Sequence, residues 1–97
     1  MEWKGTEAER KAIADDFAKA AAWAKQHNRP LFLGEFGAYD KAAMDSRVRY
    51  TDAVARTAEA QGWSWCYWQF ERDFSVYDTK TETWVEPILK ALIPARK

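Results

Sequence analysis

The sequence contains little of what metal, redox or membrane chemistry requires. It has one cysteine, Cys66, and one histidine, His27, so it can form no internal disulfide and lacks the usual ligands of a zinc site. Basic and acidic residues both number 15, which leaves no excess charge to attract a nucleic acid or an anionic membrane. No apolar run is long enough to span a bilayer. We therefore expect no metal, no cofactor, and neither a nucleic acid nor a membrane as partner.

The chain is also short, and it begins without the apolar core of a signal peptide. Its 97 residues allow one small domain, residues 1–97, whose hydrophobic core is expected to be marginal. The cellular location is left open by the sequence.

Aromatic residues, in contrast, are abundant. The chain has 6 tryptophans, 4 tyrosines and 5 phenylalanines. Four of the tryptophans follow one another closely, at positions 63, 65, 68 and 84. Such a group indicates either packing against something larger or a stacking platform for a flat ligand.

Local signals predict an α/β chain in the order helix, strand, helix, strand, helix. Thr6 and Glu9 form a capping box, and Asn28 followed by Pro30 ends the first helix, expected over residues 7–27. The later elements are expected at residues 31–36, 44–58 (with Gly62 just beyond), 63–70 and 85–92. Residues 71–83 read as a polar loop with a turn at Asp78. A helix between two strands makes the strands parallel.

Two parallel strands form an incomplete sheet, because both edges and one face stay open. Alternation places Ser64, Cys66 and Trp68 on one face of the second strand, with Leu31 and Leu33 facing the same way from the first. Cys66 is expected to be a small buried filler. Trp63, Trp65 and Tyr67 are expected to pack under the helices. The chain is therefore either part of a larger sheet or barrel, or a homo-oligomer that associates through its exposed strand edges.

The candidate catalytic residue is Glu35, within the segment LFLGEFGAY at residues 31–39. It closes an apolar strand, and α/β barrels place catalytic groups at the carboxyl ends of their strands. Gly34 and Gly37 permit close approach of a ligand or another backbone. The alternative is a solvated carboxylate without a catalytic role.

The segment LFLGEFGAY, followed by a helix and then by WSWCYWQF and FSVYD, resembles the C-terminal part of glycoside hydrolase family 5, the cellulase family. The resemblance covers essentially the whole chain. It implies part of a (β/α)8 barrel whose strands seven and eight are the two strands here, and an enzyme that cleaves β-1,4-linked polysaccharides with retention. It further implies that Glu35 is the nucleophile, that Trp68 lines the sugar site, and that the parent enzyme is secreted or periplasmic.

A retaining glycosidase needs a second carboxylate about 5 Å from its nucleophile, which acts as acid and base. The family carries this residue on strand four, which the chain lacks. Glu71 follows the second strand and is a candidate substitute, since neighbouring strands lie about 4.8 Å apart. We therefore expect the isolated chain to be inactive or very weak. The alternative is a non-catalytic scaffold that binds carbohydrate or itself, and the sequence does not say which β-linked polysaccharide is bound.

Overall fold

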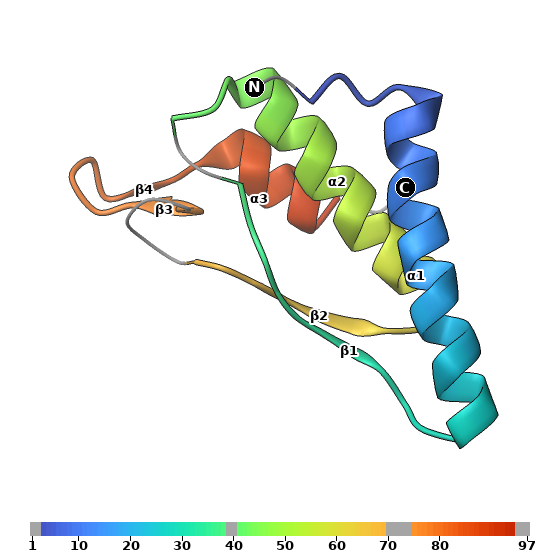
Figure 1. Cartoon of the computed structure of the whole chain (residues 1–97). Helices are drawn as coiled ribbons and strands as arrows, with labels where there is room; N and C mark the ends of the chain where they lie inside the picture. The colour runs from blue at the N-terminus through green and yellow to red at the C-terminus, as the bar shows by residue number, and fades with distance from the viewer. Residues whose placement is uncertain (1–2, 39–40, 70–74, 95–97) are drawn as a thin grey trace.

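The computed structural model describes residues 3–38, 41–69 and 75–94. Its elements follow in the order α1 (Glu7–His27), β1 (Phe32–Phe36), α2 (Met44–Ala60), β2 (Ser64–Tyr67), β3 (Tyr77–Asp78), β4 (Thr83–Trp84) and α3 (Glu86–Leu92). Strands β1 and β2 pair in parallel, as the sequence predicted. Helix α2 joins them and contacts α1 and α3, while the β3–β4 hairpin projects beyond this group (Figure 1). Within the part of the chain that is described, no helix is long and apolar enough to cross a membrane.

Helix α1 has the predicted bounds because both of its ends are satisfied locally. The Thr6 hydroxyl accepts a hydrogen bond from the Glu9 amide at 3.2 Å, and the Glu9 carboxylate accepts one from the Thr6 amide at 2.9 Å. This is the predicted capping box. At the other end Asn28 adopts φ 54°, which lets the Arg29 amide donate to the Ala24 carbonyl at 2.9 Å.

Helix α2 ends in a left-handed turn at Gly62, which has φ 77°. The Gly62 amide donates to the Glu59 carbonyl at 2.9 Å, and the Trp63 amide donates to the Ala58 carbonyl at 3.0 Å. These are the two bonds of a Schellman motif, which requires a residue that tolerates positive φ. The predicted position of Gly62 just past the helix is confirmed.

The segment predicted as a polar loop contains a short hairpin. Strands β3 and β4 pair antiparallel, and the rings of Tyr77 and Trp84 meet edge to face with centroids 5.2 Å apart. The predicted turn at Asp78 is present: its carboxylate accepts hydrogen bonds from the amides of Lys80 (2.9 Å) and Thr81 (3.3 Å).

The hydrophobic core lies where α2 and α3 meet one face of the β1–β2 pair. Phe36 is buried there, and its ring meets those of Trp65 and Tyr67 edge to face at 5.7 and 5.4 Å. The buried core cluster consists of Phe36, Val54, Ala55, Val76, Ile88 and Leu92. Trp63 instead packs against Phe17 of α1, with the two rings tilted and their centroids 5.0 Å apart. Both predicted core tryptophans, Trp63 and Trp65, therefore pack against the helices.

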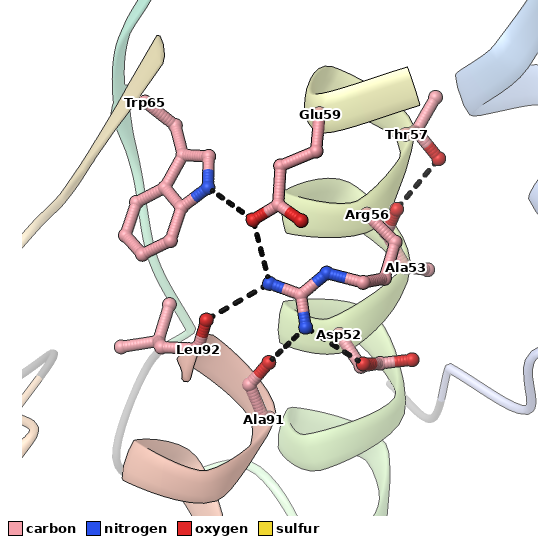
Figure 2. Close-up of polar contacts among 8 residues, drawn as sticks. All are labelled: Asp52, Ala53, Arg56, Thr57, Glu59, Trp65, Ala91 and Leu92. Atoms are coloured by element: carbon pink, nitrogen blue, oxygen red, sulfur yellow. Dashed lines mark hydrogen bonds and ion pairs between the residues drawn. The ribbon is translucent and has the colours of Figure 1, made fainter. Parts of the chain in front are cut away.

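Arg56 on α2 forms hydrogen bonds that connect α2 to α3 and, through Glu59, to β2 (Figure 2). Its guanidinium donates to the carbonyls of Ala91 at 3.1 Å and Leu92 at 2.8 Å, which closes the C-terminal end of α3. It also donates to Glu59 at 2.9 Å, and the same carboxylate accepts a hydrogen bond from the Trp65 indole at 3.0 Å. The contacts link α3 to α2 and α2 to β2.

This arrangement makes part of the stability depend on pH. The Trp65 indole N–H, and then Arg56, lower the pKa of Glu59 below its ordinary value of 4.5. A lowered folded-state pKa stabilises the protein above about pH 4.5, and the contribution disappears as pH falls through the folded pKa. We expect Glu59→Gln to destabilise the chain at pH 7 by less than about 1 kcal/mol, because the carboxylate is half exposed.

Urea unfolding at pH 7 and pH 3 measures the effect. The difference between wild type and Glu59→Gln should shrink at pH 3. Glu82→Gln, at an exposed position in the β3–β4 turn, is the control and should show no such change. An equal loss of stability for Glu59→Gln at both pH values would contradict the prediction.

Candidate active site

Strand β1 contains a bulge at Gly34 and Glu35. Leu33 and Phe36 are three residues apart, whereas the residues that they pair with on β2 are only two apart. Leu33 and Phe36 both pack into the core, and the two residues between them are both exposed. Bulges of this kind re-aim side chains and are frequent beside active sites. The extra residue lets Glu35 stay exposed although Leu33, two residues earlier, packs against the core.

The structure corrects the predicted orientation of β1, because Leu33 pairs with Trp65 and both side chains pack against the core. Leu33 was expected to face the same way as Trp68, but it lies on the helix-covered face instead. Phe32, paired with Ser64, faces outward and is 61% exposed. A strict period of two would place Leu33 and Glu35 on one face, and the extra residue breaks that period. The only local signal for it is Gly34, since glycine within a strand often marks a bulge.

Trp68 lies at the same end of the strand pair as Glu35. It is 47% exposed, and its amide donates a hydrogen bond to the Phe36 carbonyl at 2.7 Å, which extends the pairing beyond β2. The peptide bond between Trp68 and Gln69 is cis. An exposed carboxylate and an exposed indole thus stand at the carboxyl ends of two adjacent parallel strands.

The open face also carries small residues. Ser64 and Cys66 are exposed on β2, as their predicted orientation requires. The expectation that Cys66 is buried is wrong for this chain, because nothing in the described residues covers that face. A methyl group added at Gly34 would meet no atom within 4 Å. Glu71, the candidate substitute acid, lies outside the described residues.

The described residues contain no group of three or more His, Cys, Asp or Glu side chains placed to hold a metal ion. The chemistry that the arrangement offers is that of a carboxylate nucleophile or base beside an aromatic surface. A ring such as the Trp68 indole suits the apolar face of a sugar.

Known proteins match this chain in sequence and in structure. A solved endoglucanase superposes with a TM-score of 0.94 at 44% identity, over 98% of this chain and 31% of its own. Thermotoga maritima Cel5A, solved in complex with cellobiose and with mannotriose, superposes with a TM-score of 0.91 at 40% identity, over 96% of this chain and 30% of its own. Endoglucanase 3 of Fibrobacter succinogenes is 30% identical over 70 residues, which are 71% of this chain and 11% of that protein.

The chain thus spans less than a third of each of these proteins. The model of the cellulase family, glycosyl hydrolase family 5, matches residues 1–73. The structural neighbours are barrel endoglucanases, and this chain corresponds to one part of them. The chain belongs to glycosyl hydrolase family 5, the cellulase family.

Proposed function

We propose that the chain is the nucleophile-bearing part of a retaining endo-β-1,4-glucanase. Glu35 is the nucleophile and Trp68 is the surface on which a sugar ring stacks. The observation that carries the proposal is the placement of these two exposed side chains at the ends of adjacent parallel strands, in a chain of this family.

In this proposal β1 and β2 are strands seven and eight of the barrel, and their open face is part of the barrel interior. The exposure pattern supports it: the helix-facing residues Leu33, Phe36 and Trp65 pack in the core, while Phe32 and Trp68 are exposed. Parallel sheets are normally covered on both faces. The missing strands would supply that cover and close both edges.

The proposed reaction has two steps. The Glu35 carboxylate attacks the anomeric carbon and forms a glycosyl ester as the bond to the leaving oxygen breaks, and a second carboxyl group protonates that oxygen. The same second group then takes a proton from water, which attacks the anomeric carbon and releases Glu35. This acid/base residue would come from the part of the barrel outside the chain, so the isolated chain is expected to be inactive or very weak.

The proposed substrate is a β-linked oligo- or polysaccharide of glucose, with mannan as the alternative. The support is sequence similarity: Thermotoga maritima Cel5A, which is 40% identical over the matched region, was solved with cellobiose and with mannotriose. Trp68 contributes a flat apolar surface that suits either sugar, because their pyranose rings both present C–H groups.

The test is to complete the barrel. We expect residues 1–97, joined to strands one to six of a family 5 endoglucanase, to hydrolyse a chromogenic cellobioside, with the isolated chain at least about 10²-fold slower. The loss of activity in the isolated chain follows from the missing acid/base. A folded but inactive hybrid, as judged by circular dichroism and a single cooperative transition, would contradict the proposal.

A second candidate function is a self-associating scaffold, favoured by the uncovered face around Phe32. In this reading copies of the chain cover one another's open strands, and the protein is a homo-oligomer. Light scattering at high micromolar concentration should then show a dimer or larger species. Phe32→Lys should return the chain to a monomer, whereas Ile93→Lys, exposed at the end of α3, should not. A wild-type monomer at that concentration would exclude the scaffold.

A further inference from the structure

A cavity of about 540 Å³ lies where β1 ends and α2 begins. Its size falls within the range of small-molecule sites. It is lined by residues of the N-terminal segment, of the segment after β1 and of the first turns of α2, including Trp3, Lys41, Ser46, Arg47 and Tyr50. The exposed residues of the strand face, such as Phe32 and Trp68, do not line it. Glu35 is not among the described residues that line it, although Gly37 and Ala38, which follow β1, are.

The walls of the cavity are fixed by contacts within the chain. The Trp3 amide donates to the Ser46 hydroxyl at 3.1 Å, and the Trp3 carbonyl accepts hydrogen bonds from the Arg49 guanidinium at 3.3 Å. The Trp3 ring meets the Tyr50 ring edge to face at 5.7 Å. The Arg10 guanidinium lies 5.5 Å from the centre of the Trp3 ring. The N-terminal segment is thus held against α2 independently of any further barrel strand.

Arg47 is a buried cation that pairs with no anionic side chain among the described residues. Only 5% of the residue is exposed. Its guanidinium makes a long hydrogen bond of 3.4 Å to the Ser75 carbonyl and a contact of 4.0 Å to the Met44 sulfur, and its Nε has no partner. None of the ion pairs between described residues includes it. Burying a charge without a counter-charge is costly, so the position favours a bound anion.

Two further sources of positive charge lie at this cavity, the Lys41 ammonium group and the N-terminus of α2. Lys41 lines it and is exposed, so its ammonium group can reach a ligand at the mouth. Helix α2 begins there after Ala43, whose side chain cannot cap it, and the first amides of any helix lack intrahelical partners. Free amides at a helix N-terminus and the helix dipole both favour negative charge.

Beside Arg47, two hydroxyl groups are buried without a well-aligned hydrogen bond, those of Thr51 and Tyr67. Burial raises the pKa of the Tyr67 phenol, and the nearby Ala38 amide, Arg47 and Thr51 oppose this without reversing it. The phenol therefore stays neutral at physiological pH and does not supply the missing negative charge. The described groups around Arg47, the Ser75 carbonyl and the hydroxyls of Thr51 and Tyr67, are neutral, and no described carboxylate pairs with it.

We propose that the cavity is an anion-binding site that takes one oxyanion group, a carboxylate or a phosphate, between Arg47, Lys41 and the first turn of α2. The site is independent of the role proposed for Glu35. A carboxylate could come from an acidic sugar, whose ring would contact Trp3 and Tyr50, and a phosphate could be free in solution.

The test is an NMR titration of the 97-residue chain with sodium phosphate, sodium glucuronate and glucose at constant ionic strength. The amide signals of Ser46 and Arg47 and the Trp3 indole signal should shift saturably with both anions, which should compete, and should not move with glucose. Tighter binding of glucuronate would identify an acidic sugar as the occupant, and tighter binding of phosphate would identify the free anion.

Lys41→Gln should weaken anion binding about two- to fivefold, the effect of one exposed charge, while Lys25→Gln, at an exposed position near the end of α1, should leave it unchanged. Arg47→Gln should abolish the binding in a chain that circular dichroism shows to be folded. Glu35→Gln should leave it unchanged, which separates this site from the proposed catalytic one. The proposal is overturned if neither anion shifts these signals, if glucose shifts them equally, or if the two lysine variants behave alike.

Discussion

Glu35→Gly in the completed barrel is expected to lower kcat/KM for an aryl cellobioside by roughly 10⁴-fold or more, the scale on which an enzyme loses activity with its nucleophile. The carboxylate is exposed at the strand end, so its removal opens no cavity in the core. Circular dichroism should therefore match that of the unsubstituted hybrid, and Tm should fall only slightly, because glycine within a strand costs about 0.5–1 kcal/mol. Initial rates of nitrophenol release measure the loss.

Azide then distinguishes a nucleophile from an acid/base residue. In Glu35→Gly a small anion can occupy the space of the lost carboxylate and attack the anomeric carbon directly. We expect azide to restore turnover and to yield a glycosyl azide of inverted configuration, because one displacement has replaced two. Proton NMR of the product reads the configuration.

Asp78→Gly is the control, since it removes a carboxylate of the β3–β4 hairpin, where it accepts hydrogen bonds within a turn. It should retain most of the activity of a hybrid that stays folded, and azide should not change its product. An azide product of retained configuration in the Glu35 variant would assign acid/base chemistry to Glu35. Activity that survives the Glu35 substitution would remove it from the mechanism altogether.

The parts of the fold that the sequence predicted correctly are those with local causes. Thr6, Glu9 and Asn28 specify both ends of α1 within a few residues of each end, and Gly62 does the same for α2. The hairpin was missed because its two strands have only two residues each, too few for a periodic pattern. Its edge-to-face pair, Tyr77 and Trp84, forms across a loop and leaves no local signal.

At the candidate site, too, some features were predicted from the sequence and others were not. The strand-end position of Glu35 was predicted from the sequence, and so was the face of Trp68 opposite Trp65, which agrees with its exposure. Their catalytic and binding roles stay predictions. The bulge did not follow, because pairing register depends on which side chains enter the core: Leu33 and Phe36 both do so. Arg47 was missed as well, since the carbonyl that accepts its hydrogen bond is that of Ser75, 28 residues away in the sequence.

Ile88→Ala is expected to have the largest effect on stability. Ile88 lies in α3, is fully buried, and packs in the core cluster with Val54 and Leu92. Removing buried methylene groups costs both their transfer free energy and the energy of the cavity that remains, about 2–5 kcal/mol together. A domain of this size has only about 5–15 kcal/mol of stability in total. The substitution therefore removes a large part of it.

Thermal unfolding followed by circular dichroism measures the change. For a domain of this length 1 kcal/mol shifts Tm by about 4–8 °C, so Ile88→Ala should lower Tm by about 10 °C or more, or leave the chain unfolded. Ile93→Ala is the matched control, because Ile93 is 68% exposed only five residues further on. Its stability should change by no more than about 0.5 kcal/mol. Equal shifts for the two variants would mean that α3 does not pack on α2 in the isolated chain, and the core would then depend on the rest of the barrel.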